Sequence, residues 1–440
     1  MASHQPDRRW HGRGPGRRVL GRTQHHLLAV RAGGRASAVS RGTTTGRRAR
    51  TLRRLRRTIN WRKRPIAGRL ERGGDRADSR VDTIVATSRF FRPAVARLEP
   101  YTPGRQPAPD ARVVKLNTNE NPYPPSPAAQ AALASLDVDG LRRYPDPMAA
   151  TFQQAVAETL GVAADWVLAG NGSDDLLTML FRAVAGPGRA VAYPNPTYVL
   201  YRTLSAMQEA PVIEAPFDSD YRLPVDALIT AGAPLTLVAN PNSPSGTLVQ
   251  LDDLDRLAAG LDGLLVVDEA YVAFASSDAL PLIRSHDNVL VLRTLSKSHG
   301  LAGLRLGFAV GQPDVLAGLT KVKDSYNVDA VAMKIGASAL RDTTYTAEVV
   351  ARIIATRTRL VTALEQRGFR VWPSQANFVL ARPVDGDARR LHAGLDARGV
   401  LVRYFDEPGL DDCLRITVGT DEEQARLLDA LSELQPPANA

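Results

Sequence analysis

From about residue 91 onward, short apolar segments alternate with longer segments that have helical periodicity. The clearest apolar segments are residues 166–168, 235–238, 264–267, 289–292 and 306–310. Helical patterns separate them, for example at residues 174–185 and 251–260. Continuously apolar strands that alternate with helices are typical of a mostly parallel sheet covered on both faces. The sequence therefore predicts an α/β fold.

The pattern changes toward the C-terminus. A long helical pattern covers residues 346–367, and segments rich in strand-forming residues follow at 377–381 and 414–418. This change predicts a second, smaller α+β domain beside the large one. We expect residues 138–337 to form the large domain, and residues 93–137 together with about 338–440 to form the small one.

Residues 1–92 differ in composition from the rest of the chain. They contain 25 Lys and Arg but 5 Asp and Glu, a net charge of +20, whereas the remainder has 31 and 41, a net charge of −10. The segment lacks apolar periodicity, so burial cannot offset its ordering entropy, and we expect it to be disordered. A transit peptide, a nucleic-acid-binding arm and an extension without function, left by a misassigned start, are alternative interpretations. The acidic body gives no indication of nucleic-acid binding.

Three further features narrow the class of protein. No apolar run approaches the roughly 20 residues of a membrane-spanning helix. Cys413 is the single cysteine, so an intramolecular disulfide is excluded, which fits a reducing, cytoplasmic compartment. Of the 7 histidines, 4 lie in the basic N-terminal segment, so we expect no histidine-based metal site.

Four motifs follow predicted strands, where open α/β sheets bind their ligands. The first, Ala-Gly-Asn-Gly-Ser-Asp-Asp at residues 169–175, lies between a strand and a helix. Its glycines allow a tight turn that exposes helix N-terminal amides to an anion, although Ser173 or Asp174 as a simple helix cap explains the same pattern. The second, Asn-Pro-Asn-Ser-Pro-Ser-Gly at residues 240–246, is an irregular turn whose Asn side chains can contact a ligand or cap the turn.

The other two motifs carry ionisable side chains. An apolar segment delivers Asp268 to the carboxyl edge of the predicted sheet, where it can pair with a buried cation, bind a metal or cap a turn. Lys297 lies in Ser-Lys-Ser-His-Gly between two apolar segments, and Arg305 follows eight residues later. A solvated surface lysine is the alternative, but the flanking glycines and apolar residues argue against it.

Together these motifs resemble the fold-type I transferases that depend on pyridoxal 5′-phosphate (PLP), and most closely the histidinol-phosphate aminotransferase family. The resemblance runs from about residue 98 to residue 434. Six further segments carry it: Glu-Pro-Tyr at 99–101, Leu-Asn-Thr-Asn-Glu-Asn-Pro-Tyr at 116–123, Arg-Tyr-Pro at 143–145, Tyr-Pro-Asn-Pro-Thr-Tyr at 193–198, Asn-Phe-Val-Leu at 377–380 and Leu-Arg-Ile-Thr-Val-Gly-Thr at 414–420.

The resemblance implies roles for individual residues. Lys297 would hold PLP as a Schiff base and carry the proton between substrate and cofactor. Asp268 would pair with the pyridinium nitrogen and Tyr271 would hydrogen-bond the phenolic oxygen of the ring. The resemblance also implies that Tyr198 stacks on the ring. The residues that would hold the phosphate are Ser173, Asp174, Ser296 and Arg305. Tyr144 would reach the same phosphate from the partner subunit of a homodimer.

One position departs from the family pattern. The family usually has an Asn where Ser243 stands, and that Asn contacts the ring oxygen. In this chain either Asn242 or the Ser243 hydroxyl would take its place.

The substrate follows from the same resemblance. Arg415, Arg403 and Tyr101 occupy the positions that would bind the anionic group of the substrate, and paired guanidinium groups suit both a phosphate and a dicarboxylate. The implied reaction is transamination between L-histidinol phosphate and 2-oxoglutarate. The alternatives are an aromatic amino-acid aminotransferase, a PLP-dependent decarboxylase of a phosphorylated amino acid, and a non-enzymatic sensor that uses the same fold.

Overall fold

The computed structural model describes residues 90–99, 104–108 and 112–434. Nearly all of the N-terminal segment that we expect to be disordered therefore lies outside the described residues, and so does Tyr101. Among the helices that the structure describes, none has both the length and the apolar character needed to span a bilayer.

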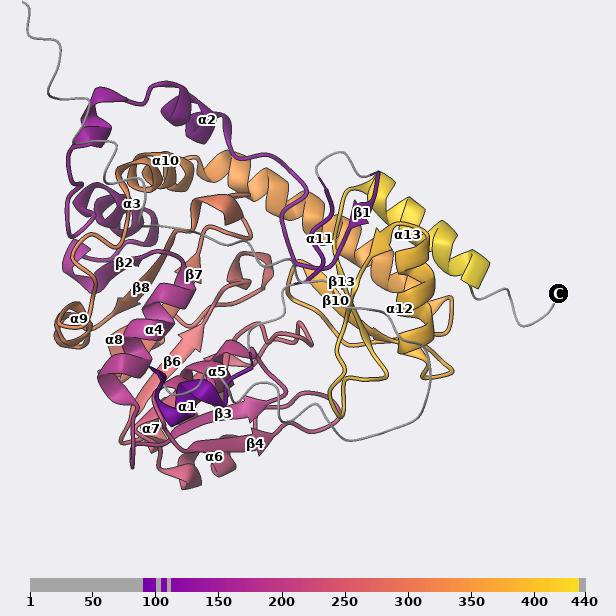
Figure 1. The fold of residues 1–440 in the computed structure, drawn as a ribbon, viewed down its shortest axis with the longest axis horizontal. Helices are drawn as coiled ribbons and strands as arrows, with labels where there is room; N and C mark the ends of the chain where they lie inside the picture. The colour runs from indigo at the N-terminus through magenta and orange to yellow at the C-terminus, as the bar shows by residue number, and fades with distance from the viewer. Residues whose placement is uncertain (1–89, 100–103, 109–111, 435–440) are drawn as a thin grey trace, which may run out of the picture. The chain divides into compact units, whose positions relative to one another are not determined.

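A seven-stranded sheet forms the centre of the fold, with the strand order β2-β8-β7-β6-β5-β3-β4 (Figure 1). Neighbouring strands are parallel except around β8, which runs antiparallel to both β7 and β2. The predicted mostly parallel sheet is therefore confirmed. The strands are β2 (Val167–Gly170), β3 (Val191–Asn195), β4 (Val212–Pro216), β5 (Leu235–Ala239), β6 (Leu264–Asp268), β7 (Val289–Thr294) and β8 (Gly307–Gly311).

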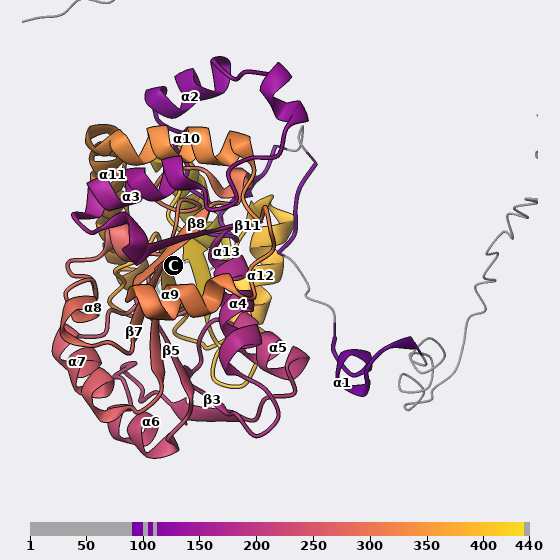
Figure 2. The same ribbon diagram turned by 90° about the vertical axis from the view of Figure 1, so that its left-hand side faces the viewer.

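Helices cover both faces of this sheet because its strands are apolar on both sides. In β7, Val289 and Val291 pack into the core on one face, and Leu290 and Leu292 pack into the core on the other. Figure 2 shows the strands between these two layers of helices. The first face is covered by α3 (Ala150–Leu160), α6 (Val225–Ala231), α7 (Leu251–Gly260), α8 (Leu282–Ser285) and α10 (Ala330–Arg341), and the second by α4 (Ser173–Val184), α5 (Leu200–Met207) and α9 (Pro313–Thr320).

Local sequence explains where several helices begin and end. The Ser126 side chain accepts a hydrogen bond from the Ala129 amide and so caps α2 (Pro127–Ala134), whose first residue is a proline. The Asp329 side chain caps α10 in the same way. Gly161 ends α3 with φ 65°, a left-handed conformation that glycine adopts without steric cost.

The observed elements agree with the predicted ones to within a few residues. Helix α7 has the predicted bounds, and α11 (Thr343–Glu365) begins three residues before the pattern that predicted it. Strand β2 begins at Val167 because Trp166 ends a short 3-10 helix. The 3-10 helices are η2 (Asp139–Arg142), η3 (Ala164–Trp166), η4 (Val272–Phe274) and η5 (Ala302–Leu304).

A second hydrophobic core lies around the C-terminal elements. Helix α11 extends from the end of α10 toward a four-stranded antiparallel sheet with the order β12-β13-β10-β9 (Figure 1). Buried residues of α11, of this sheet and of the last two helices form the core. The elements are β1 (Val114–Lys115), paired with β11 (Val400–Leu401), then β9 (Arg370–Val371), β10 (Phe378–Arg382), α12 (Ala388–Ala397), β12 (Arg403–Tyr404), β13 (Leu414–Thr417) and α13 (Asp421–Leu434).

Two N-terminal helices pack against the large sheet's helices. Ala129 and Ala132 of α2 are buried in the core that contains α3 and α10, although the predicted boundary assigns them to the smaller domain. The short helix α1 (Pro93–Ala96) lies next to α5, and Arg92 before it forms an ion pair with Glu209. The predicted division into domains stays a proposal.

Candidate active site

A cavity of about 720 Å³ lies at the edge of the large sheet where its parallel strands end. Ala239, Asp268 and Thr294, the last residues of β5, β6 and β7, line this cavity. Because β8 runs in the opposite direction, its beginning lies at the same edge and brings Arg305 into the lining. Residues outside the large sheet complete the lining, among them Asn117, Thr118, Asn119, Glu120, Arg403 and Arg415.

Asp268 presents one free carboxylate oxygen at the cavity. Its Oδ2 accepts a hydrogen bond of 2.9 Å from the Tyr201 hydroxyl, whereas Oδ1 is buried without a hydrogen-bond partner among the described residues. Burial raises the pKa of Asp268 to about 6, and the bond from Tyr201 opposes this shift. Burying a carboxylate oxygen without a hydrogen-bond partner costs free energy. We therefore expect Oδ1 to accept a hydrogen bond from a ligand in the cavity, preferably from a cationic donor.

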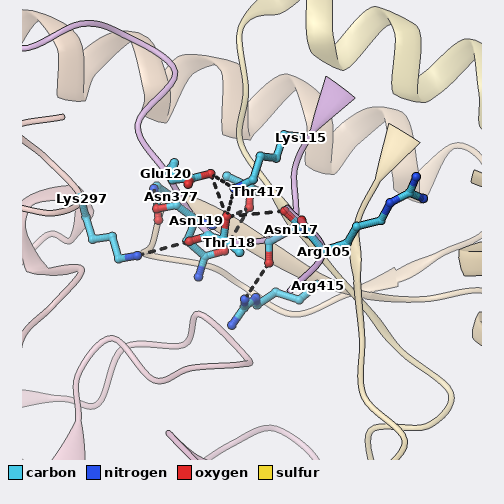
Figure 3. A network of polar contacts seen from close by, with 10 residues as sticks. All are labelled: Arg105, Lys115, Asn117, Thr118, Asn119, Glu120, Lys297, Asn377, Arg415 and Thr417. Atoms are coloured by element: carbon cyan, nitrogen blue, oxygen red, sulfur yellow. Dashed lines mark hydrogen bonds and ion pairs between the residues drawn. The ribbon is translucent and has the colours of Figure 1, made fainter. Parts of the chain in front are cut away.

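Lys297 follows β7 and directs its amine into the same cavity. Its Nζ donates a hydrogen bond of 3.3 Å to the carbonyl oxygen of Thr118, as Figure 3 shows, and lies 5.7 Å from the centroid of the Tyr271 ring. Asn121 holds the backbone of this segment by donating to the carbonyl oxygens of Lys297 and Ser298. The amine is therefore placed by a fixed segment of backbone rather than left on a solvated surface.

Asn119 connects the Tyr271 hydroxyl to the second core. Its Nδ2 donates to Tyr271 Oη at 3.0 Å, and its Oδ1 accepts from the Thr417 hydroxyl at 3.1 Å. Asn377 Nδ2 donates to the Asn119 carbonyl oxygen, and Figure 3 shows Asn119, Asn377 and Thr417 gathered beside Lys297. Asn119 has φ 55°, which Asn tolerates better than most residues. The network fixes the Tyr271 hydroxyl at the cavity wall.

The beginning of α4 forms an anion-binding corner with Arg305. Gly172 precedes the helix with φ 82°, and a Cβ atom there would lie 2.9 Å from Arg305 Nη2, so a larger residue would displace the guanidinium. The free amides at the helix N-terminus carry a partial positive charge. Ser296 lines the same cavity, and its Oγ accepts a hydrogen bond from the Thr294 hydroxyl at 2.9 Å.

Asp174 joins this corner to Tyr198. Its Oδ2 forms an ion pair with Arg305 at 3.1 Å, and its Oδ1 accepts from the Tyr198 hydroxyl at 3.1 Å. Burial and the nearby Asp174 charge raise the pKa of Tyr198 well above its ordinary value, so the hydroxyl remains a donor. Tyr198 also lines the cavity.

Arg403 and Arg415 lie directly opposite each other on β12 and β13. Side chains of opposed residues in an antiparallel pair project from the same face, so both guanidinium groups reach the cavity. Arg415 donates to Ser243 Oγ and to the Asn117 carbonyl oxygen, each at 3.2 Å. The Phe405 ring lies 5.4 Å from the Arg403 guanidinium carbon and 5.5 Å from that of Arg415. The pair forms a cationic wall suited to a phosphate or carboxylate.

The arrangement defines the chemistry that the cavity can support. It offers an amine nucleophile, a carboxylate oxygen that lacks a donor, and two separate anion-binding regions. Such a set fits a cofactor with a protonated ring nitrogen and a phosphate, placed beside a substrate that carries its own anionic group.

The sequence model of the family described as "Aminotransferase class I and II" matches residues 111–431. This chain is a class I and II aminotransferase. Curated relatives place it among the histidinol-phosphate aminotransferases: histidinol-phosphate aminotransferase 1 of Trichormus variabilis is 52% identical over 345 residues, which cover 78% of this chain and 99% of that protein. The histidinol-phosphate aminotransferase of Rhodopirellula baltica is 46% identical and covers 76% of this chain and 92% of its own length. The predicted family is confirmed.

Solved structures show the same fold for this aminotransferase. The crystal structure of histidinol-phosphate aminotransferase from Sinorhizobium meliloti, in complex with pyridoxal-5′-phosphate, matches with a TM-score of 0.72 and 28% identity, covering 80% of this chain and 99% of that one. Aspartate aminotransferase from Thermus thermophilus with maleate, at 21% identity, matches with a TM-score of 0.64 and shows the likeness of fold alone. The predicted fold-type I class is confirmed.

The structure brings most of the predicted site residues of this aminotransferase into one cavity. The predicted residues that line it are Ser173, Asp174, Tyr198, Asp268, Tyr271, Ser296, Lys297, Arg305, Arg403 and Arg415.

Three predicted residues are not part of this lining. Asn242 is buried in its own turn, where its amide nitrogen donates to Ser245 Oγ at 2.9 Å; Ser243, the alternative, lines the cavity. Tyr144 is 81% exposed and its ring stacks on that of Tyr326, with the ring centroids 4.6 Å apart. Tyr101 lies outside the described residues.

Several residues at the site have no predicted role, and Tyr201, Asn119 and Phe405 are those that contact predicted site residues most directly. Tyr201 lies in the first turn of α5, three residues after Tyr198, which precedes the helix, and no sequence signal indicated that its hydroxyl meets Asp268. Asn119 lies in a segment that carries the family resemblance, but only its hydrogen bond to Tyr271 shows what it contacts. Phe405 has no sequence signal beyond its position two residues after Arg403.

Within the described part of the aminotransferase, no group of three or more His, Cys, Asp or Glu side chains is placed to hold a metal ion. Cys413 is buried and forms no disulfide.

Proposed function

We propose that this aminotransferase uses PLP to transfer an amino group between L-histidinol phosphate and 2-oxoglutarate. The observation that carries the proposal is the opposed pair of Arg403 and Arg415, which shares one cavity with Lys297 and Asp268. The relatives that are 46% to 52% identical over most of the chain are named for the same substrate.

The side chains present fit PLP. The unpartnered Asp268 Oδ1 would accept from the pyridinium nitrogen, Tyr271 would donate to the phenolic oxygen, and Tyr198 would stack on the ring. Arg305, Ser296 and the amides at the start of α4 would hold the phosphate. Of the two candidates for a further contact with the ring oxygen, the cavity lining favours Ser243 over Asn242. When bound, PLP supplies an electron sink next to the α-carbon of the substrate.

Lys297 would perform the proton transfer. Its Nζ would attach the cofactor covalently and, once the substrate amine has displaced it, accept the proton from the substrate α-carbon. Asp268 would remain ionised opposite the ring nitrogen, because a cation beside a buried carboxylate favours its charged form.

The arginine pair would select the substrate. Histidinol phosphate carries a phosphate where the amino-acid donor carries a carboxylate, so the site must accept both anions in turn. Arg415, held by Ser243 and Asn117, offers a fixed fork, and Arg403 adds a second cation opposite it. Tyr101 would donate its hydroxyl to the same anion.

We further propose a homodimer, because Tyr144 is 81% exposed in one chain and could complete the phosphate site of a second. The large domain would be residues 138–337 and the small one residues 93–137 and 338–440. A cytoplasmic location stays a prediction.

Substrate preference tests the proposed function directly. We expect kcat/KM for histidinol phosphate to exceed that for phenylalanine, because only the former fills the cationic wall with a phosphate. Steady-state rates with each donor and 2-oxoglutarate measure this ratio. If phenylalanine is preferred by more than about tenfold, roughly 1.4 kcal/mol of transition-state stabilisation, the proposed substrate is wrong and the protein is an aromatic amino-acid aminotransferase. A protein whose bound cofactor does not change its absorbance with any amino donor would instead be a sensor, and release of carbon dioxide would indicate a decarboxylase.

Removal of the basic segment is expected to leave catalysis intact. The charge contrast between residues 1–92 and the rest motivates this prediction, since the catalytic residues all lie in the acidic body. A chain that begins near residue 85 should match the full chain in thermal unfolding, PLP binding and turnover. Loss of PLP binding on truncation would show that the segment belongs to the fold.

A further inference from the structure

Tyr201 contacts the proposed ring-nitrogen partner without lining the cavity itself. It lies on α5, and its side chain is 0% exposed. Its hydroxyl donates to Asp268 Oδ2 at 2.9 Å. The rings of Tyr193 and Tyr198 lie around it, with centroids 5.8 Å and 5.7 Å from its own. The ring is thus held by packing, and Asp268 is the carboxylate that its hydroxyl bonds among the residues the structure describes.

This contact gives the two oxygens of Asp268 different surroundings. Oδ2 is held by Tyr201, whereas Oδ1 is buried without a hydrogen-bond partner among the described residues. The Asp268 side chain itself lines the cavity. Rotating the carboxylate would break a charge-assisted hydrogen bond in a dry environment, where such bonds are strong. The bond therefore fixes the rotation of the carboxylate, so that its second oxygen is available to a ligand in the cavity.

The same contact influences the charge of Asp268. Burial and the charge of Asp174 raise the pKa of Asp268, the Tyr201 hydroxyl and the Ala270 amide lower it, and the net result is a pKa of about 6. Burial and the Asp268 charge raise the pKa of Tyr201 well above its ordinary value, so its hydroxyl stays a donor. The other ionisable groups near this contact include Tyr193, Tyr198, Tyr271, Lys297 and Arg305, the last paired with Asp174.

We propose that Tyr201 is a positioning residue, whose hydroxyl holds one oxygen of Asp268 and keeps the other ionised and directed at a protonated ring nitrogen in the cavity. The inference rests on the proposed function in one respect, that the cavity binds PLP. Tyr201 would act only through Asp268, since it does not line the cavity.

The test compares PLP binding by the wild type and by Tyr201→Phe without any amino donor. Affinity is measured by equilibrium dialysis from about pH 5 to about pH 9, a range that includes the ionisation of Asp268. The phenylalanine ring retains the packing with Tyr193 and Tyr198, so only the hydroxyl is lost. The groups of PLP itself titrate in both measurements, and the difference between them therefore reports the protein.

We expect the pH dependence of affinity to shift upward. Binding needs the ionised carboxylate, so affinity is present above the pKa of Asp268 and is lost as the pH falls through it. Without the hydroxyl that lowers this pKa, the loss begins about one pH unit higher, and affinity at acidic pH is about tenfold weaker than in the wild type.

Two controls separate this role from a general effect on packing. Tyr221→Phe removes a hydroxyl from another buried tyrosine, one outside this cavity, and should leave affinity and its pH dependence unchanged. In an Asp268→Asn background, Tyr201→Phe should no longer shift the pH dependence of PLP affinity, because asparagine can accept the Tyr201 hydrogen bond but has no charge for the hydroxyl to maintain. Thermal unfolding of each variant checks that it folds.

If Tyr201→Phe does not fold, 3-fluorotyrosine in place of Tyr201 provides a second test. It keeps the bond and makes the hydroxyl a stronger donor, so the pH at which affinity is lost should fall. The inference is overturned if either replacement leaves the pH dependence at the wild-type value, or if the Tyr201→Phe effect persists in the Asp268→Asn background. Failure of the proposed function would be visible separately, as a wild type that does not bind PLP.

Discussion

Replacement of Lys297 by alanine is expected to abolish transamination and the visible absorption band of the covalently bound cofactor. The amine at this position would serve both as the covalent attachment point and as the proton carrier. General acid-base catalysis alone contributes about 10² to 10⁴-fold in rate, so losing both roles should lower turnover by at least that factor. Absorption spectra after addition of PLP and steady-state rates with histidinol phosphate measure the two effects.

A matched control is Lys321→Ala, which removes a lysine that follows α9 and does not line the cavity. It should retain both the absorption band and the wild-type rate. Thermal unfolding of the two variants shows whether either substitution disturbs the fold. Normal turnover by Lys297→Ala would end the proposed mechanism, because no other lysine lines this cavity among the described residues.

Replacement of Asp268 by asparagine is expected to leave a cofactor site that binds PLP weakly and reacts slowly. Asparagine has nearly the same shape and can still accept the Tyr201 hydrogen bond, but it cannot compensate the charge of a protonated ring nitrogen. Breaking a buried ion pair by removing one partner costs about 3–5 kcal/mol, which corresponds to at least about a hundredfold in rate. PLP affinity and single-turnover rates with histidinol phosphate measure the loss.

Asp226→Asn provides the comparison for this substitution. It removes a carboxylate that pairs with Arg256 outside the catalytic cavity, so its rate should equal that of the wild type. A rate for Asp268→Asn within about twofold of the wild type would show that the carboxylate is structural and that its charge is not used.

The sequence by itself was enough to predict the architecture. Strands buried on both faces must be apolar along their whole length, and this requirement appears in a single segment such as β6 without knowledge of its neighbours. The ends of such strands also mark where Asp268 and Lys297 must lie, because parallel strands end at one edge of a sheet, whereas Arg305 reaches that edge only because β8 runs antiparallel. The predicted bounds of the helices and strands differ from the observed ones by a few residues, since helix and strand ends depend on capping and packing.

Only the tertiary structure decided how these side chains meet. The register of β12 and β13 opposes Arg403 and Arg415, and the packing of α5 on the sheet brings Tyr201 to Asp268, which is 67 residues away in the chain. The choice between Asn242 and Ser243 was likewise open, because the direction of each side chain depends on how its turn folds against β13 and Asn117. The local pattern of apolar and polar residues indicates whether a residue is buried. Contacts between residues that are remote in sequence form only when separate elements pack against one another.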